Sequence, residues 1–240
     1  MTVIEVRDLH KRYRGRVAVH AISFSVEAGE VFGIAGPNGS GKTTTVECVE
    51  GLRSRDGGSI RVLGLDPRTD RAELRRRLGV QLQESQLPER ITVREALELF
   101  ASFYPRPADW RALLSELGLT EQRNTRFARL SGGQKQRLSI ALALVGNPAV
   151  AIFDELTTGL DPQARRDTWD LIRAVRARGV TVVLVSHFMD EIERLCDRVA
   201  VVRAGRTLVV DTPANIVAAT PVPGVERPTL EDAVLTLTRD

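Results

Sequence analysis

The sequence predicts a layered α/β fold with a largely parallel sheet. Short apolar segments alternate with helical segments along most of the chain, as in strands joined by crossover helices. The 240 residues, 42% of them hydrophobic and 27% charged, suit one large globular domain or one domain with an insertion. No apolar run approaches the roughly 18 residues of a membrane span, and the N-terminus lacks the layout of a signal peptide. We therefore expect a cytoplasmic protein.

The first third of the chain is the richest in strand signals. Strands are expected at residues 3–9 and 17–26, and the partial alternation of 17–26 predicts a half-buried antiparallel strand. Residues 30–36 read as a buried strand that enters a glycine-rich turn. Further strands are expected at residues 59–64, 78–82, 150–153, 180–185 and 198–202.

Strand signals disappear between residues 84 and 147. Thr92 and Glu95 have capping-box spacing before a helical apolar pattern, and Gly118 follows a second helical segment as a C-terminal cap. We expect residues 1–83 and 148–218 to form the α/β core with an antiparallel β-subdomain. Residues 84–147 would then be an inserted helical subdomain, and 219–240 a proline-rich linker with a short amphipathic helix.

Composition limits the kinds of partner. The net charge of +3 is too small to indicate a nucleic-acid surface without clustering. Cys48 and Cys196 fit neither a disulfide framework nor a metal motif, so both are expected to be buried thiols. Lysine occurs only at Lys11, Lys42 and Lys135 among 34 basic residues.

One of these lysines lies in a glycine-rich loop that matches the P-loop pattern. The loop follows a predicted strand and precedes a helical stretch, and it consists of Gly36, Pro37, Asn38, Gly39, Ser40, Gly41, Lys42, Thr43 and Thr44. Such a loop wraps phosphate with its backbone N–H groups at a helix N-terminus. We expect Lys42 to contact the β- and γ-phosphates and the Thr43 hydroxyl to bind Mg²⁺. The alternative is a plain helix-capping turn, but a lysine kept in an arginine-rich chain favours a phosphate site.

A second apolar strand ends in two adjacent carboxylates, Asp154 and Glu155. In P-loop proteins an Asp at such a strand end holds Mg²⁺. Because strand side chains alternate between faces, Glu155 would point away from Asp154, toward a water behind the γ-phosphate. The alternative is a surface acidic pair.

The sequence LSGGQ precedes this strand and contains Ser131, Gly132, Gly133 and Gln134, which we call the signature loop. Capping-box spacing explains Ser131 and Gln134. It does not explain two glycines in a first helical turn, each of which costs about 1 kcal/mol relative to alanine. Glycines there are expected if a phosphate must approach the backbone.

With these motifs in this order, the chain resembles the nucleotide-binding subunit of an ATP-binding-cassette (ABC) transporter over nearly its whole length. Its arginine-rich texture is most similar to bacterial drug-resistance exporters of the daunorubicin group. The resemblance implies a P-loop NTPase core with an N-terminal antiparallel β-subdomain and an inserted all-helical subdomain. It also implies ATP and Mg²⁺ as cofactors.

The resemblance implies further site residues. Tyr13 would stack on adenine, although it also fits a strand-edge aromatic. Gln83 would link the core to the helical subdomain and touch Mg²⁺ or the attacking water, with Gln81 as the alternative on the same strand face. His187 would contact the γ-phosphate. Asp161, followed by a proline, suits a helix N-cap, and in the family it also communicates across a dimer.

The resemblance further implies head-to-tail docking of two copies, with each ATP held by the P-loop of one and the signature loop of the other. Glu155 would act as general base, while Lys42, His187 and Mg²⁺ would stabilise the transferring phosphoryl group. A membrane-spanning permease would contact the helical subdomain and the segment near Gln83. This places the protein peripherally on the cytoplasmic face of the membrane, as part of an exporter of drugs or other small hydrophobic compounds, with no nucleic acid expected.

Two other functions remain open at this point. A soluble ABC-type ATPase could act on nucleic acid, the ribosome or an assembly scaffold, but such relatives usually carry two cassettes or a long coiled-coil insertion. A regulatory subunit that does not hydrolyse ATP is disfavoured because Glu155 and His187 are both present. One departure from the family pattern is Leu156 where proline is usual. Leucine should leave the turn freer and adds a backbone N–H.

Overall fold

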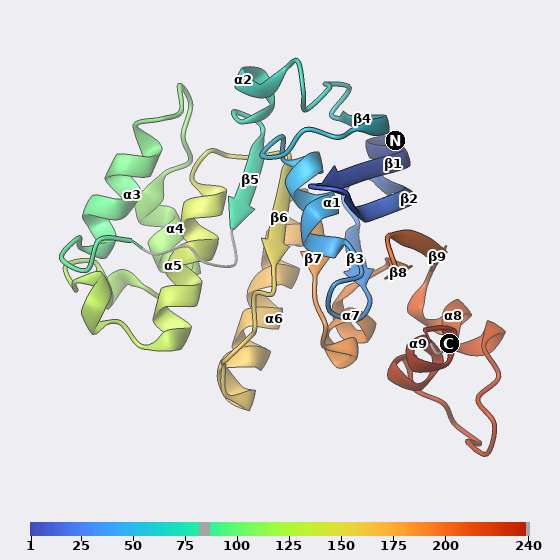
Figure 1. Cartoon of the computed structure of the whole chain (residues 1–240). Helices are drawn as coiled ribbons and strands as arrows, with labels where there is room; N and C mark the ends of the chain where they lie inside the picture. The colour runs from blue at the N-terminus through green and yellow to red at the C-terminus, as the bar shows by residue number, and fades with distance from the viewer. Residues whose placement is uncertain (82–86, 239–240) are drawn as a thin grey trace.

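A single mixed sheet organises the molecule (Figure 1). The computed structural model describes residues 1–81 and 87–238, and within them the strand order is β4-β1-β2-β9-β8-β3-β7-β6-β5. The strands are β1 Thr2–Tyr13, β2 Arg16–Glu27, β3 Val31–Ala35, β4 Gly57–Val62, β5 Leu78–Gln81, β6 Val150–Asp154, β7 Thr181–Val185, β8 Arg198–Arg203 and β9 Arg206–Asp211. Strands β8, β3, β7, β6 and β5 are parallel, whereas β1 pairs antiparallel with β2 and β4. The predicted fold class is confirmed.

The helices are α1 Lys42–Val49, α2 Arg71–Leu74, α3 Val93–Ala101, α4 Trp110–Glu116, α5 Gly132–Leu144, α6 Pro162–Ala177, α7 Met189–Leu195, α8 Pro213–Ala219 and α9 Leu230–Leu237, with 3₁₀ turns at Thr120–Gln122 and Phe127–Arg129. Helices α3, α5 and α6 begin at the predicted N-caps Thr92, Ser131 and Asp161. The Thr92–Glu95 capping box opens α3 as predicted. Gly118 follows α4 in the left-handed region, with φ of 63°, which only glycine adopts readily.

Alternate residues of the central strands face two separate hydrophobic cores. On β6, Ala151 and Phe153 pack with α3–α9, whereas Val150 and Ile152 pack with α1, α2 and the antiparallel strands. Period-two alternation thus gives each short apolar strand two buried faces. Both cysteines are buried as expected, and burial raises the pKa of the Cys48 thiol to about 11.

Residues 87–147 form no strand, and Figure 1 shows α3, α4 and α5 gathered beside β5. Close packing of α5 on β5 depends on Gly79, because a Cβ there would collide with the carbonyl oxygen of Ala143. Helix α5 starts at the signature loop, so this contact fixes one part of the candidate site relative to the sheet.

The C-terminal region differs from the prediction in two elements. Strand β9 and helix α8 were not anticipated. The β8–β9 turn has positive φ at Ala204 (46°) and Gly205 (71°), a hairpin geometry that alanine does not signal in a sequence. The predicted amphipathic helix is α9, whose buried Leu230, Ala233 and Val234 belong to the same core as α7.

Candidate active site

The phosphate loop, residues 36–44, joins the end of β3 to the start of α1. Gly39 (φ 77°) and Gly41 (φ 102°) adopt left-handed backbone conformations, and Gly41 is the N-cap of α1. The Lys42 ammonium donates hydrogen bonds to the carbonyl oxygens of Gly36 (2.7 Å) and Pro37 (3.0 Å). The loop therefore encloses a positive charge at a helix N-terminus, the arrangement that attracts phosphate.

Lys42 and the two carboxylates form one electrostatic cluster. Lys42 is only 7% exposed. Burial lowers the pKa of its ammonium, whereas the negative charges of Glu155 and Asp154 act in the opposite direction. Lys42 follows β3, and the two carboxylates lie at the end of β6; β7 separates these two parallel strands in the sheet. Ligands bind at the carboxyl ends of the strands in open α/β sheets.

Asp154, the last residue of β6, has the features of a cation ligand. It is 6% exposed, and among the described residues its Oδ1 has no hydrogen-bond partner. Burial, followed by the charge of Glu155, raises the pKa of its carboxyl to about 6. A buried carboxyl oxygen without a donor fits a metal ion, because a cation would provide the missing partner. The donor set of Asp154 and the Thr43 hydroxyl consists of oxygen atoms, which Mg²⁺ prefers.

The backbone directs the side chains of Asp154 and Glu155 apart, but not by the strand alternation that the sequence predicted. Strand β6 ends at Asp154, and Glu155 has a left-handed φ of 51° while its N–H bonds the carbonyl oxygen of Val185 at 2.9 Å. The expectation that strand alternation separates the two carboxylates was therefore wrong, since a backbone reversal does so. This reversal brings Oε1 of Glu155 to 3.3 Å from Nδ1 of His187, which follows the adjacent strand β7.

A groove of about 460 Å³ brings several predicted residues together, and we call it the nucleotide groove. Its lining comprises Tyr13, Arg16, Val17, Ala18, Asn38, Gly39, Gly41, Lys42, Thr43, Thr44 and Glu155. Cationic groups also approach the Tyr13 ring, with Lys11 Nζ 5.4 Å and Arg53 Cζ 5.6 Å from its centroid. The sequence reasoning missed Arg16, although its pairing with Tyr13 across the β1–β2 turn would follow from recognising that hairpin.

The signature loop lies in a different hollow, of about 640 Å³. This signature hollow is lined by Gly118, Gln122, Ser131, Gly132, Gly133, Gln134, Arg137, Gly159, Leu160, Asp161, Gln163, Ala164 and Asp167. The Ser131–Gln134 capping box is present as predicted. Asp161 is confirmed as the N-cap of α6, because its Oδ1 accepts from the N–H groups of Gln163 and Ala164, each at 2.9 Å.

Among the neighbours in residues 1–81 and 87–238, no contact requires the two glycines of the signature loop. A Cβ at Gly132 would lie 4.0 Å from Leu160, and one at Gly133 would lie 3.6 Å from Ala164. Both distances are ordinary van der Waals contacts. Packing against the described residues therefore does not explain the cost of glycine in this first helical turn. The sequence reasoning also missed the Arg137–Asp167 ion pair (2.9 Å) beside this hollow.

The predicted site residues thus lie on two surfaces of one chain. The phosphate loop, Tyr13 and Glu155 share the nucleotide groove, with Asp154 and His187 adjoining them. The signature loop and Asp161 line the signature hollow. Gln83 falls outside the described residues, so its placement stays a prediction.

Comparisons with known proteins agree with this arrangement. The ABC transporter family model matches residues 19–158, more than half of the chain. A Nod factor export ATP-binding protein I of Burkholderia orbicola (strain AU 1054) is 42% identical over 220 residues, covering 89% of this chain and 72% of that protein.

Solved structures give the same result. The structure of an ATP-binding subunit of an ABC transporter has a TM-score of 0.87 and 28% identity, covering 99% of this chain and 100% of that one. A bacterial Atm1-family ABC exporter with ATP bound has a TM-score of 0.79 and 28% identity, covering 90% of this chain and 39% of that one.

The P-loop, the Asp-Glu strand end and the signature loop on this fold define an ABC-type ATP-binding subunit. The chain belongs to the ABC transporter family, as an ATPase that serves a transporter. Along residues 1–81 and 87–238, none of its helices has the length and apolar character that a membrane crossing requires.

Proposed function

We propose that two copies of this chain dock head to tail around two ATP molecules and drive export through a membrane-spanning partner. The observation that carries the proposal is the division of the site residues between two hollows. The nucleotide groove offers phosphate and base contacts, and the signature hollow offers a second set of backbone groups at the N-terminus of α5. A second copy would bring the signature hollow of one chain over the nucleotide groove of the other.

In this complex the residues around the groove divide the chemistry. Tyr13 stacks on adenine, and Lys42 leaves the loop carbonyls to neutralise the β- and γ-phosphates. Thr43 and Asp154, together with Gln83, would hold Mg²⁺, and the ion would supply positive charge to the phosphate oxygens.

Glu155 and His187 lie next to each other and act on the attacking water and the γ-phosphate. Glu155 accepts a proton from the attacking water, and the imidazole of His187, 3.3 Å from the Glu155 carboxylate, contacts the γ-phosphate. The closeness of the two side chains supports a shared position behind that phosphate, with both groups oriented toward the same water.

The membrane partner fits a groove of about 500 Å³ between the core and the helical region, which we call the lateral groove. It is lined by Glu50, Leu52, Ala72, Arg75, Arg76, Leu78, Val80, Phe100, Phe103, Tyr104 and Leu142. Phe103 is 65% exposed and Leu52 45% exposed, so a partner segment would find uncovered apolar surface. Strand β5, which borders this groove, leads directly to the segment containing Gln83. The permease would hold the ATPase on the cytoplasmic face of the membrane.

The direction of transport follows from the relatives. The relatives named for Nod factor export and the structural likeness to an ABC exporter support export. Drugs or other small hydrophobic compounds stay the predicted cargo. We expect no nucleic-acid or ribosomal partner.

A mixing experiment tests the docked pair. Lys42→Ala disables the phosphate loop, and Ser131→Arg fills the signature hollow; each variant alone should hydrolyse almost no ATP. If each ATP lies between two chains, a mixed dimer keeps one intact site, formed by the phosphate loop of the Ser131→Arg chain and the signature loop of the Lys42→Ala chain. An equimolar mixture should then recover up to about one quarter of the wild-type rate.

The control is a mixture of Lys42→Ala with Glu155→Gln, in which both lesions affect the nucleotide-groove side and no fully intact site can form. The shared site would be contradicted if two results occur together. The Lys42→Ala and Ser131→Arg mixture would stay inactive, and Glu155→Gln alone would still form an ATP-dependent dimer on size exclusion. Copurification with ribosomes or nucleic acid instead of a multi-helix membrane protein would contradict the transport role.

A further inference from the structure

A contact between α6 and the residue after His187 has no role in the reaction described so far. The His187 and Phe188 rings are 4.1 Å apart between centroids and tilted by 39°. The guanidinium carbon of Arg165 lies 4.2 Å from the centroid of Phe188, within cation–π range. Arg165, Phe188, His187 and Glu155 therefore form a continuous row of contacts that ends at the candidate base.

Other partners hold Arg165 only loosely. Its Nη1 lies 3.9 Å from Oδ2 of Asp190, too far for a hydrogen bond, and among the described residues its Nε has no hydrogen-bond partner. Its side chain is 25% exposed. The face of the Phe188 ring is therefore a main support of this guanidinium.

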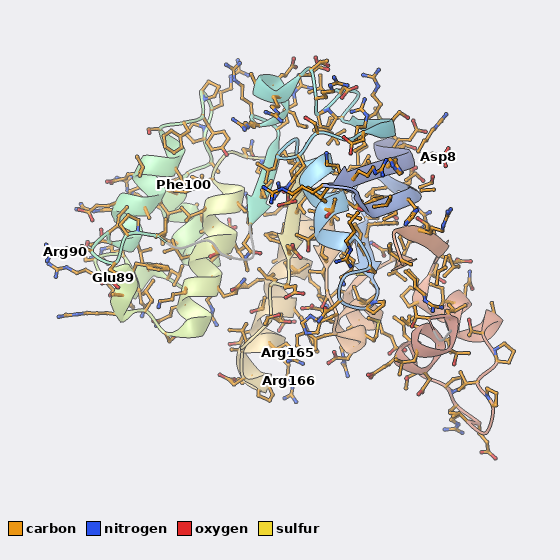
Figure 2. All side chains as sticks on the ribbon, in the orientation of Figure 1. Asp8, Glu89, Arg90, Phe100, Arg165 and Arg166 are labelled. Atoms are coloured by element: carbon orange, nitrogen blue, oxygen red, sulfur yellow. The ribbon has the colours of Figure 1, made fainter. Side chains whose placement is uncertain are left out.

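The position of Arg165 in α6 suits a fixed support. Its backbone N–H bonds the carbonyl oxygen of Asp161, the helix N-cap, at 3.0 Å. Arg166 follows it on the same helix and is exposed, and both are labelled in Figure 2. Arg165 therefore contacts Phe188, next to His187, whereas the exposed Arg166 provides a matched control.

We propose that Arg165 is a positioning residue that holds His187, through the Phe188 ring, in the orientation in which its Nδ1 meets Glu155. The inference rests on the proposed roles of His187 and Glu155. The His187 side chain is 37% exposed and follows a strand end, so neighbours on its inner side must fix its rotamer. Misplacing a catalytic group by about 1 Å can cost on the order of 100-fold in rate.

The kinetic test compares single variants of the full chain. Arg165→Met keeps much of the side-chain volume but removes the charge, and it should lower kcat for ATP about tenfold while the Kd for ATP changes less than about twofold. Arg165→Lys should restore most of the rate, because an ammonium also binds an aromatic face. Arg166→Met should match the wild type.

A spectroscopic readout separates positioning from a general structural effect. The chain has three histidines, so its imidazole NMR spectrum is simple, and His187→Gln identifies the signal of His187. That signal should carry a ring-current shift from Phe188. Arg165→Met should move it without moving the other two, and Phe188→Leu, as a second variant, should abolish the shift and lower kcat similarly.

The kinetic and NMR results together decide whether Arg165 positions His187. An unchanged kcat for Arg165→Met, or a lowered kcat with an unmoved His187 signal, would overturn the proposal. If Arg165→Met does not fold, Phe188→Leu decides it by the same two measurements. Full hydrolysis by His187→Gln would instead remove the proposed role of His187 itself and thus identify a failure of the proposed function.

Discussion

Glu50 is a buried carboxyl group whose replacement by glutamine should change how stability depends on pH. It follows α1, it is 4% exposed, and its Oε2 has no hydrogen-bond partner in the described part of the chain. Burial, followed by the charges of Asp154 and Glu47, raises the pKa of this carboxyl from 4.5 to about 8. Glu50→Gln keeps the shape of the side chain and removes the ionisation.

The sign and size of the effect follow from linkage. Between pH 4.5 and about 8 the folded chain retains the Glu50 proton that the unfolded chain has released, so this residue makes the free energy of unfolding fall as pH rises. Each pH unit in the window is worth up to about 1.4 kcal/mol. From pH 6 to pH 8 the wild type should therefore lose about 2 kcal/mol through Glu50 alone, and Glu50→Gln should lose none of this share.

Urea unfolding at pH 6, 7 and 8, without nucleotide, measures the difference. The comparison is between slopes, because other groups titrate in both proteins and cancel. Glu193→Gln, which replaces an exposed carboxylate of α7, should keep the wild-type slope. Equal slopes for Glu50→Gln and wild type would show that Glu50 is ionised in the folded protein, which would refute the reasoning.

Three further changes test other parts of the structure. Asp154→Asn should raise the free energy of unfolding at pH 8 by about 3 kcal/mol without nucleotide, because it removes a buried carboxylate whose pKa is raised from 3.8 to about 6. The same variant should lose the Mg²⁺-dependent part of stabilisation by ATP, and calorimetry measures both effects. Leu156→Ala should cost about 2–5 kcal/mol in urea unfolding, and a loss under about 1 kcal/mol would contradict its burial. Phe103→Asp should abolish copurification with the membrane partner but spare ATP hydrolysis by the isolated chain, whereas the exposed Leu235→Asp should change neither.

Local rules predicted the parts of the site that depend on local chemistry. The phosphate loop requires glycines with positive φ next to a helix start, and both appear where the sequence placed them. The capping boxes at Thr92 and Ser131 depend on residues three positions apart, so they are readable without a fold. The resemblance located Tyr13 and Asp161, and the structure places each at the edge of a hollow.

Features that arise from contacts between distant segments were not readable. The contact between Arg137 and Asp167 joins two helices thirty residues apart in the chain, and no local pattern indicates it. The stacking of Arg165 on Phe188 depends on how α6 packs beside α7, which single-sequence periodicity does not specify. Strand β9 was missed because its residues are mostly half-buried and show little apolar alternation.

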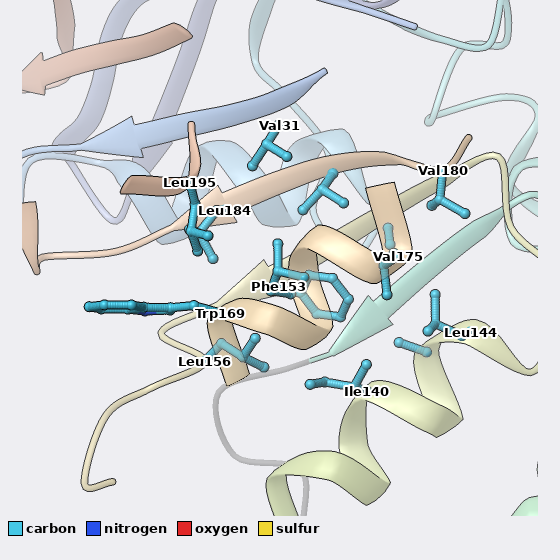
Figure 3. Packing of buried hydrophobic residues seen from close by; sticks show 14 of the residues in the cluster. Val31, Ile140, Leu144, Phe153, Leu156, Trp169, Val175, Val180, Leu184 and Leu195 are labelled. Atoms are coloured by element: carbon cyan, nitrogen blue, oxygen red, sulfur yellow. The ribbon is translucent and has the colours of Figure 1, made fainter. Parts of the chain in front are cut away.

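Leu156 shows why a local rule can describe a residue correctly and still misjudge its effect. Leucine does free the backbone relative to proline, and the sequence therefore suggested a looser turn after Glu155. In the structure the Leu156 side chain is 1% exposed, and Figure 3 shows it in the core beside Phe153 and Trp169. Glu155 thus lies between strand β6 and the buried residue Leu156. Its own backbone has a left-handed φ, which is costly for a residue with a Cβ. Packing of Leu156 opposes relaxation of that strained residue, so the leucine contributes to the placement of Glu155 by burial where proline would do so through its ring.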